Sequence, residues 1–168
     1  MWTDVAPYRS ITHTNGASLK GETRVTLPLE FTFSYPQELM NLARQLIMKQ
    51  RFSLAVIVVH KACEIATERT ISETVDAKGE QHLKRRAKKL PLGYNNLARE
   101  KVRSLYTELT GGNLPQDIWI AFKTSADLRN AIVHRGRIAN DAEAEASYKA
   151  CNDVLEHLLG RMRQTQSY

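Results

Sequence analysis

The sequence predicts a mainly α-helical protein, an up-and-down helical bundle of four to five helices preceded by a short N-terminal β-hairpin or extended arm. Three observations predict this class. From Pro36 onward, apolar residues recur at helical spacings of three and four positions. Glycines, prolines and a capping sequence divide this stretch into segments of helical length with short connections. Residues 1–35 lack this helical spacing, so we expect an N-terminal extension there and the bundle at 36–168.

Alternation of apolar and polar residues distinguishes the N-terminal extension. It runs from Val25 to Ser34 and is typical of a strand with one apolar face. Pro28 lies within this strand and favours an edge position, and Asn15-Gly16 upstream is typical of a hairpin turn. Because two strands are not stable alone, we expect the arm to pack on the bundle or on a second copy of the chain.

Prolines and glycines mark the expected helix ends, since proline suits a first turn and glycine suits a C-cap. The ends predicted in this way are Pro36, Gly79, Gly111, Pro115 and Gly136. The second helix opens at Phe52 with apolar residues on all sides, so we expect it at the centre of the bundle. The last helix begins at Asn140, with Glu143 in the spacing of a capping box.

Length and composition restrict the class of protein. The chain has 168 residues, of which 42% are hydrophobic and 25% charged, as in a single globular domain. The two cysteines are too few for a disulfide framework, which favours a reducing compartment. No apolar run is long enough for a membrane span or a signal peptide. We therefore expect a cytoplasmic protein with no membrane partner.

Familiar cofactor and metal motifs are missing from the sequence. There is no glycine-rich phosphate loop after a strand, no CxxC and no HExxH, and the five histidines are scattered along the chain. The sequence predicts neither a metal site nor a cofactor.

The fourth expected helix, which begins at Pro115 and ends at Gly136, carries a polar stripe. At about 100° per residue, four of its polar residues fall within one narrow sector. They are Lys123, Asp127, Asn130 and His134. The other sides of this helix are largely apolar, so the stripe indicates either a functional surface or a solvent-exposed face.

Arg129 lies outside this stripe, in the apolar sector of the same helix. A guanidinium there requires a buried carboxylate or an opening onto another chain. Glu64 and Glu68 of the second helix are the candidate carboxylates. Taken alone, this helix is explained most simply by a structural ion pair beside a surface histidine.

A nine-residue run at the end of this helix resembles the R-N-x-x-x-H motif of HEPN-domain proteins. The run is Leu128-Arg129-Asn130-Ala131-Ile132-Val133-His134-Arg135-Gly136. HEPN domains are all-helical bundles found in ribonucleases of toxin–antitoxin, abortive-infection and RNA-guided defence systems. The position of the motif in the penultimate helix, the amphipathic helix after it and Glu64 in the long apolar helix strengthen the resemblance, which covers about residues 37–163.

The resemblance implies a metal-independent endoribonuclease that forms a 2′,3′-cyclic phosphate by attack of the ribose 2′-hydroxyl. His134 would move a proton, Arg129 would stabilise charge on the phosphate, and Asn130 would orient one of them. Glu64 and Asp127 would support the site. One histidine serves poorly as base and acid at once, so a homodimer with facing motifs is expected. RNA and, for a toxin, an antitoxin protein are the implied partners.

A basic run supplies most of the net charge. Residues 78–89 hold six basic residues and one acid, a net of +5 out of the chain's +6. Lysine and arginine clusters bind nucleic-acid phosphates without reading sequence, although such runs are also common on solvated surfaces. The expected RNA-binding residues are Lys84, Arg85, Arg86, Lys88 and Lys89.

Two other functions remain open from the sequence. The first is a catalytically inactive interaction module, in which Arg129 belongs to a structural ion pair and the N-terminal arm binds the partner. The second is a nucleotide-binding helical partner of a nucleotidyltransferase, as in other branches of the same family. RNA cleavage in EDTA that depends on His134 would distinguish the ribonuclease from both.

Overall fold

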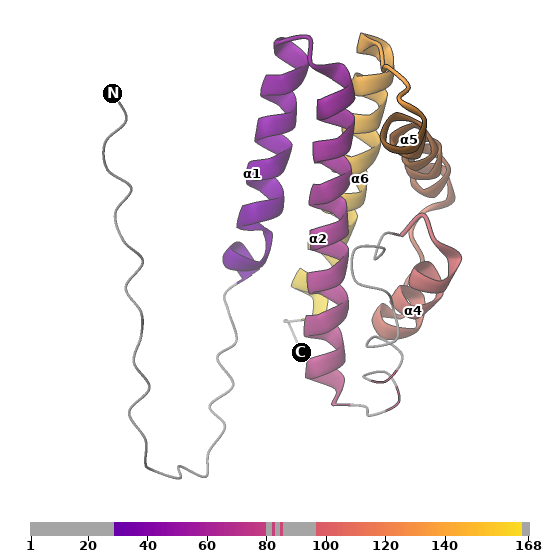
Figure 1. The fold of residues 1–168 in the computed structure, drawn as a ribbon. Coiled ribbons are helices and arrows are strands. Elements are labelled where there is room, and N and C mark those ends of the chain that lie inside the picture. Colours follow the sequence, from indigo (N-terminus) through magenta and orange to yellow (C-terminus); the bar gives the residue numbers. More distant parts are fainter. Residues whose placement is uncertain (1–28, 80–81, 83–84, 86–96, 166–168) are drawn as a thin grey trace, which may run out of the picture.

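The computed structural model describes residues 29–79, 82, 85 and 97–165, and these residues are mainly helical (Figure 1). The helices are α1 (Leu29–Met48), α2 (Phe52–Lys78), α4 (Glu100–Thr110), α5 (Gln116–Arg135) and α6 (Asp141–Thr165). No strand occurs in these ranges. The mainly α-helical class and the helical bundle are therefore confirmed.

Helix α2 lies at the centre of the bundle, as expected from its apolar opening. It packs against α1, α4, α5 and α6. Helices α1 and α2 run antiparallel through a tight turn, while α2 and α6 lie side by side and run in the same direction (Figure 1). Helix α5 is seen nearly along its own axis in that view, so it crosses this group steeply. The bundle thus differs from a simple up-and-down arrangement.

Helix α1 begins at Leu29, earlier than the expected start at Pro36, which is buried inside the helix. Residues 29–34, expected to continue a strand, are therefore helical, and α1 runs through the expected boundary between residues 35 and 36. A helix satisfies its backbone hydrogen bonds internally, whereas a strand must pair with a neighbouring strand. The alternating pattern of this segment does not show whether such a strand exists. The rest of the expected arm, including the hairpin turn, lies outside the described residues.

The predicted ends of the later helices are confirmed. Gly79, Gly111 and Gly136 cap α2, α4 and α5 in the left-handed conformation, with φ of 68°, 67° and 67°. At the start of α6, the Glu143 N–H donates to Asn140 Oδ1 (2.9 Å) and the Asn140 N–H donates to Glu143 Oε2 (3.1 Å). This reciprocal pair is the predicted capping box.

The apolar core forms two clusters. The larger one joins all five helices and includes Met40, Tyr106, Phe122 and Leu158. The smaller one lies where α1, α2, α5 and α6 meet, around Val56 and other buried residues. No helix within the described ranges is both long and apolar enough to cross a membrane.

Candidate functional site

Helix α5 carries the motif, and its residues divide into a buried side and an exposed side. The buried residues are Phe122, Ser125, Ala126, Leu128, Ala131 and Ile132. The predicted polar stripe is confirmed as exposed, and its members are Lys123, Asp127, Asn130 and His134. Gly136 ends the helix two residues after His134, because its left-handed conformation lets its N–H bond the carbonyl of Ala131.

Arg129 forms the ion pair predicted from its apolar surroundings. Its Nη2 lies 3.7 Å from Oε1 of Glu64, whose side chain is only 7% exposed, against 28% for Arg129. Glu64 is therefore the carboxylate partner, while Glu68 is exposed to solvent. Since both paired groups are largely withdrawn from water, removal of either leaves a charge without its counterion.

Two further contacts fix this ion pair. The Lys61 Nζ donates to the second oxygen of Glu64 at 3.3 Å, so the carboxylate lies between two cations. The Arg129 Nη1 donates to Oδ1 of Asn130 at 3.1 Å. The guanidinium thus connects the buried acid of α2 to an exposed motif residue of α5.

His60 of α2 adds a second polar contact between the same helices. Its side chain is buried, its Nε2 lies 2.7 Å from Oγ of Ser125, and its ring stacks on Phe122 with 5.2 Å between centroids. Its Nδ1 is buried and has no hydrogen-bond partner among the described residues. Burial, with a smaller effect from Arg129, lowers the pKa of His60 to about 4. The imidazole is therefore neutral at pH 7.

His60 was not among the candidate residues that the sequence indicated. A signal was available in the spacing. His60 and Glu64 lie one turn apart on α2, and their partners Ser125 and Arg129 lie one turn apart on α5. Matching pairs of polar residues on two amphipathic helices are typical of an interhelical contact.

Within the described residues Arg129 contacts Asn130, but no hydrogen bond joins His134 to either of them. Asn130 and His134 are both exposed and lie about 6 Å apart along the axis and about 40° apart around it. Arg129 is about 140° away from His134 around the helix and reaches toward α2. Asp127 is exposed, and within the described part of the chain no hydrogen bond or ion pair joins it to the motif.

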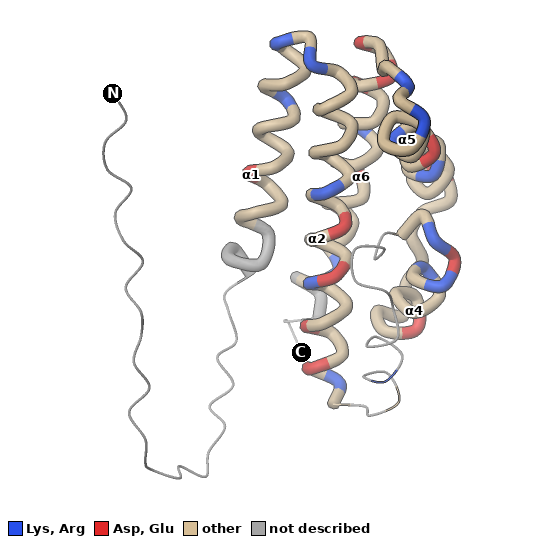
Figure 2. Tube along the Cα trace, in the orientation of Figure 1, with Lys and Arg blue, Asp and Glu red and all other residues tan. Residues whose placement is uncertain are grey.

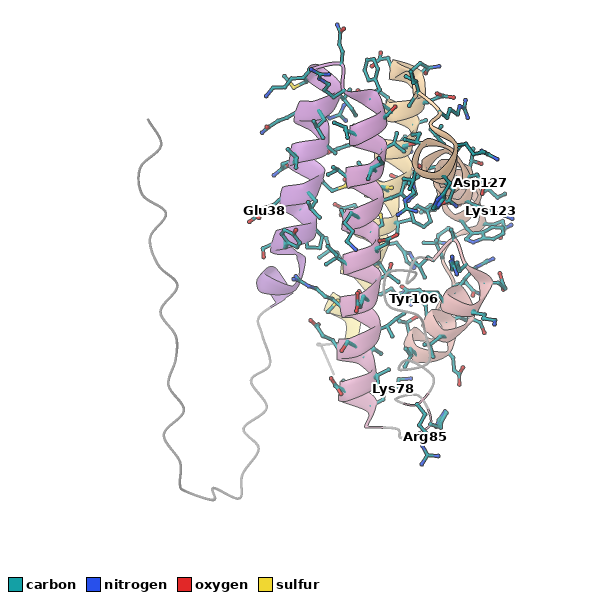
Figure 3. The ribbon with its side chains drawn as sticks, in the orientation of Figure 1. Glu38, Lys78, Arg85, Tyr106, Lys123 and Asp127 are labelled. Carbon is teal, nitrogen blue, oxygen red and sulfur yellow. The ribbon has the colours of Figure 1, made fainter. Side chains whose placement is uncertain are left out.

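The basic run is mostly outside the described residues. Arg85 is the member that the structure describes, and it is exposed. It lies beyond the end of α2, far from the labelled Asp127 on α5 (Figure 3). Lys84, Arg86, Lys88 and Lys89 lie outside the described residues. Arg85 is thus not part of the surface formed by the motif.

Comparisons with known proteins give no relative. No family model matches the chain, and neither a curated protein nor a solved structure is detectably similar to it. Function must therefore be argued from the motif and its geometry.

Proposed function

We propose that the protein is a metal-independent endoribonuclease of the HEPN type. The observation that supports this most is the arrangement at the end of α5. A histidine and an asparagine are exposed one turn apart, next to an arginine that a buried carboxylate holds in place. These are the groups needed to move protons and stabilise charge at a phosphodiester without a metal ion.

The reaction proposed is an internal transesterification of RNA. A neutral imidazole takes the proton of a ribose 2′-hydroxyl, and the resulting oxygen attacks the adjacent phosphorus. The bond from phosphorus to the 5′-oxygen breaks, and that oxygen takes a proton from an imidazolium. The products are a 2′,3′-cyclic phosphate and a free 5′-hydroxyl. Arg129 offsets the extra negative charge on the phosphate as the new bond forms.

A homodimer supplies the two imidazoles, one His134 from each chain. The surface beside His134 favours such an interface, because Val133 is 45% and Ile138 84% exposed. Leu54 of α2, 53% exposed, belongs to the same end of the bundle, since the Ala139 N–H donates to Ser53 Oγ at 2.9 Å. Exposed apolar side chains next to polar ones are typical of protein interfaces.

The biological setting belongs to the same proposal. The protein would act in the cytoplasm as a toxin or stress effector, with RNA as substrate and an antitoxin protein as its inhibitor. The basic run of residues 84–89 would hold RNA through phosphates that the motif does not contact.

A catalytically inactive interaction module is the second candidate, and one observation favours it. Arg129 already has a counterion in Glu64, so a structural role explains its presence without a substrate. In that case His134 is a surface residue, and its replacement changes neither RNA binding nor RNA cleavage.

Cleavage of single-stranded RNA by the purified protein in EDTA tests the proposal. We expect cyclic-phosphate ends in the products, and we expect His134→Ala to lower the rate by at least about 100-fold, the usual contribution of a proton-transferring histidine. The control is His82→Ala, which removes another exposed histidine and should leave the rate at saturating RNA unchanged. Cleavage that EDTA abolishes, or that His134→Ala leaves intact, would refute the proposal.

A further inference from the structure

A cluster of two cations and an aromatic ring lies between α4 and α5, apart from the motif. The Arg103 Cζ lies 4.5 Å from the centroid of the Trp119 ring, and the Lys123 Nζ lies 5.1 Å from it. Trp119 is partly buried and packs against the main core, so its ring is held in place. The cluster therefore presents a fixed aromatic surface beside positive charge.

Besides the Trp119 ring, the polar contacts of the two cations among the described residues are weak. Arg103 lies 4.0 Å from Glu100 and donates to Gln116 at 3.4 Å, both near the limit for such interactions. Lys123 is exposed, and among the described residues its ammonium group contacts the Trp119 ring. Lys123 can therefore bind an incoming anion at little cost, and the Arg103 side chain, 19% exposed, adds positive charge beside it.

The cluster is aligned with the motif along the exposed side of α5. Lys123, Asp127, Asn130 and His134 follow one another at spacings of four, three and four residues, so they share one face. The helix advances about 16 Å from Lys123 to His134, a length that a few nucleotides of a single strand can cover. Figure 3 shows Lys123 and Asp127 projecting from this side of α5.

We infer that Lys123, Trp119 and Arg103 form a binding subsite for the RNA strand flanking the cleaved phosphate, an inference that rests on the proposed ribonuclease function. Lys123 binds a backbone phosphate, Arg103 adds positive charge beside the ring, and the Trp119 ring stacks on a base when Lys123 moves to the phosphate. Aromatic stacking together with basic side chains is how proteins bind single strands irrespective of sequence.

Asp127 allows a test in which RNA affinity should rise as well as fall. It is exposed between Lys123 and the motif, and no ion pair among the described residues neutralises it. A strand that passes from Lys123 to His134 brings a phosphate close to this carboxylate, which opposes binding. Removal of the negative charge should then tighten binding, whereas removal of Lys123 should weaken it.

The experiment measures affinity for a single strand of about ten nucleotides with 2′-O-methyl riboses, which has no attacking hydroxyl. Fluorescence anisotropy at several salt concentrations compares Lys123→Ala and Asp127→Asn with two charge-matched controls. Glu38→Gln and Lys49→Ala alter exposed residues at other places, and Glu38 projects from α1 on the side of the molecule away from α5 (Figure 3).

We expect Lys123→Ala to weaken binding about three- to tenfold and to reduce the salt slope by about one. Asp127→Asn should tighten binding about two- to fivefold. Both controls should stay within about twofold of the unmodified protein, as expected for charges distant from the strand. Trp119→Phe, which keeps an aromatic ring, should retain more affinity than Trp119→Leu, with thermal melts showing that both variants are folded.

A second readout separates this subsite from the chemistry. A dinucleotide substrate reaches only the motif, so Lys123→Ala should lose more rate on longer RNA at low concentration than on the dinucleotide, whereas Lys49→Ala should show no such difference between the two substrates. If Lys123→Ala and Asp127→Asn bind like the controls, or if all four variants shift by their charge alone, the inference is wrong although cleavage by the unmodified protein still supports the ribonuclease. If the protein binds RNA with the expected changes but cleaves nothing, the subsite stands and the ribonuclease does not. If it neither binds nor cleaves RNA, both are refuted.

Discussion

The buried imidazole of His60 links the stability of the bundle to pH. In the folded protein its pKa is lowered to about 4, mainly by burial and next by Arg129, while its contact with Ser125 acts weakly in the opposite direction. In the unfolded chain the same group has its ordinary pKa of about 6.5. Between these two values the unfolded chain binds more protons than the folded one, so acidification favours unfolding.

The size of the effect follows from the difference in pKa. Stability from this group is complete above about pH 6.5 and declines as pH falls toward 4. One pKa unit corresponds to 1.36 kcal/mol, so a difference of about 2.5 between the two pKa values gives a total loss of about 3 kcal/mol in unfolding free energy. Roughly 2 kcal/mol of this is lost between pH 7 and pH 5. That is a large part of the 5–15 kcal/mol typical of a domain.

Urea unfolding at a series of pH values compares the unmodified protein with His60→Gln, which keeps a polar group near Ser125 but does not titrate. At neutral pH the variant should be less stable because packing on Phe122 changes. As pH falls to 5, the difference between the two should shrink by about 2 kcal/mol. The effects of other titrating groups cancel in this comparison because both proteins contain them. One such group is His157, whose pKa is also lowered, by burial and by Arg161. Parallel stability curves from pH 7 to 5 would refute the assignment of a buried, neutral His60.

Two further predictions concern α5. Glu64→Gln leaves the partly buried Arg129 without its counterion and should cost about 1–3 kcal/mol of unfolding free energy. The control Glu68→Gln alters an exposed residue and should cost less than about 0.5 kcal/mol. Equal losses in urea unfolding would show that the ion pair contributes nothing. Ile138→Asp should convert the proposed dimer to monomers in sedimentation and abolish cleavage. Leu42→Asp, at an exposed position of α1, should do neither. A dimer that survives Ile138→Asp contradicts an interface beside the motif.

Local sequence signals predicted most of the helical boundaries correctly. Gly111 and Gly136 adopt left-handed conformations for which glycine has no steric penalty, and Asn140 with Glu143 forms its cap from residues three apart. These features depend on neighbours in the chain. The start of α1 was wrong because an alternating pattern fits either a strand or the beginning of a packed helix, and tertiary contacts decide between them.

The candidate site was predictable in part for a different reason. Arg129 in an apolar sector requires a carboxylate, and only the second helix offered acids at a suitable place, so the Glu64 contact followed from the cost of a buried charge. His60 gave a weaker signal, its one-turn spacing from Glu64, because a histidine can be buried as a neutral group without a charged partner. The steep crossing of α5 over α2 (Figure 1) also depends on the packing of whole faces, which spacing along one helix does not determine.

The polar contacts between α2 and α5 explain which way the motif faces. Apolar side chains such as Phe122 and Leu128 hold α5 against the bundle, but close packing of apolar groups tolerates small rotations of a helix. Two directional contacts one turn apart, His60 with Ser125 and Glu64 with Arg129, fix that rotation. With Arg129 fixed on the inner side, Asn130 and His134 must lie outward, among the charges of α5 that Figure 2 shows. If His134 moves protons as proposed, this orientation places it where an imidazole of a second chain can approach it from outside the bundle.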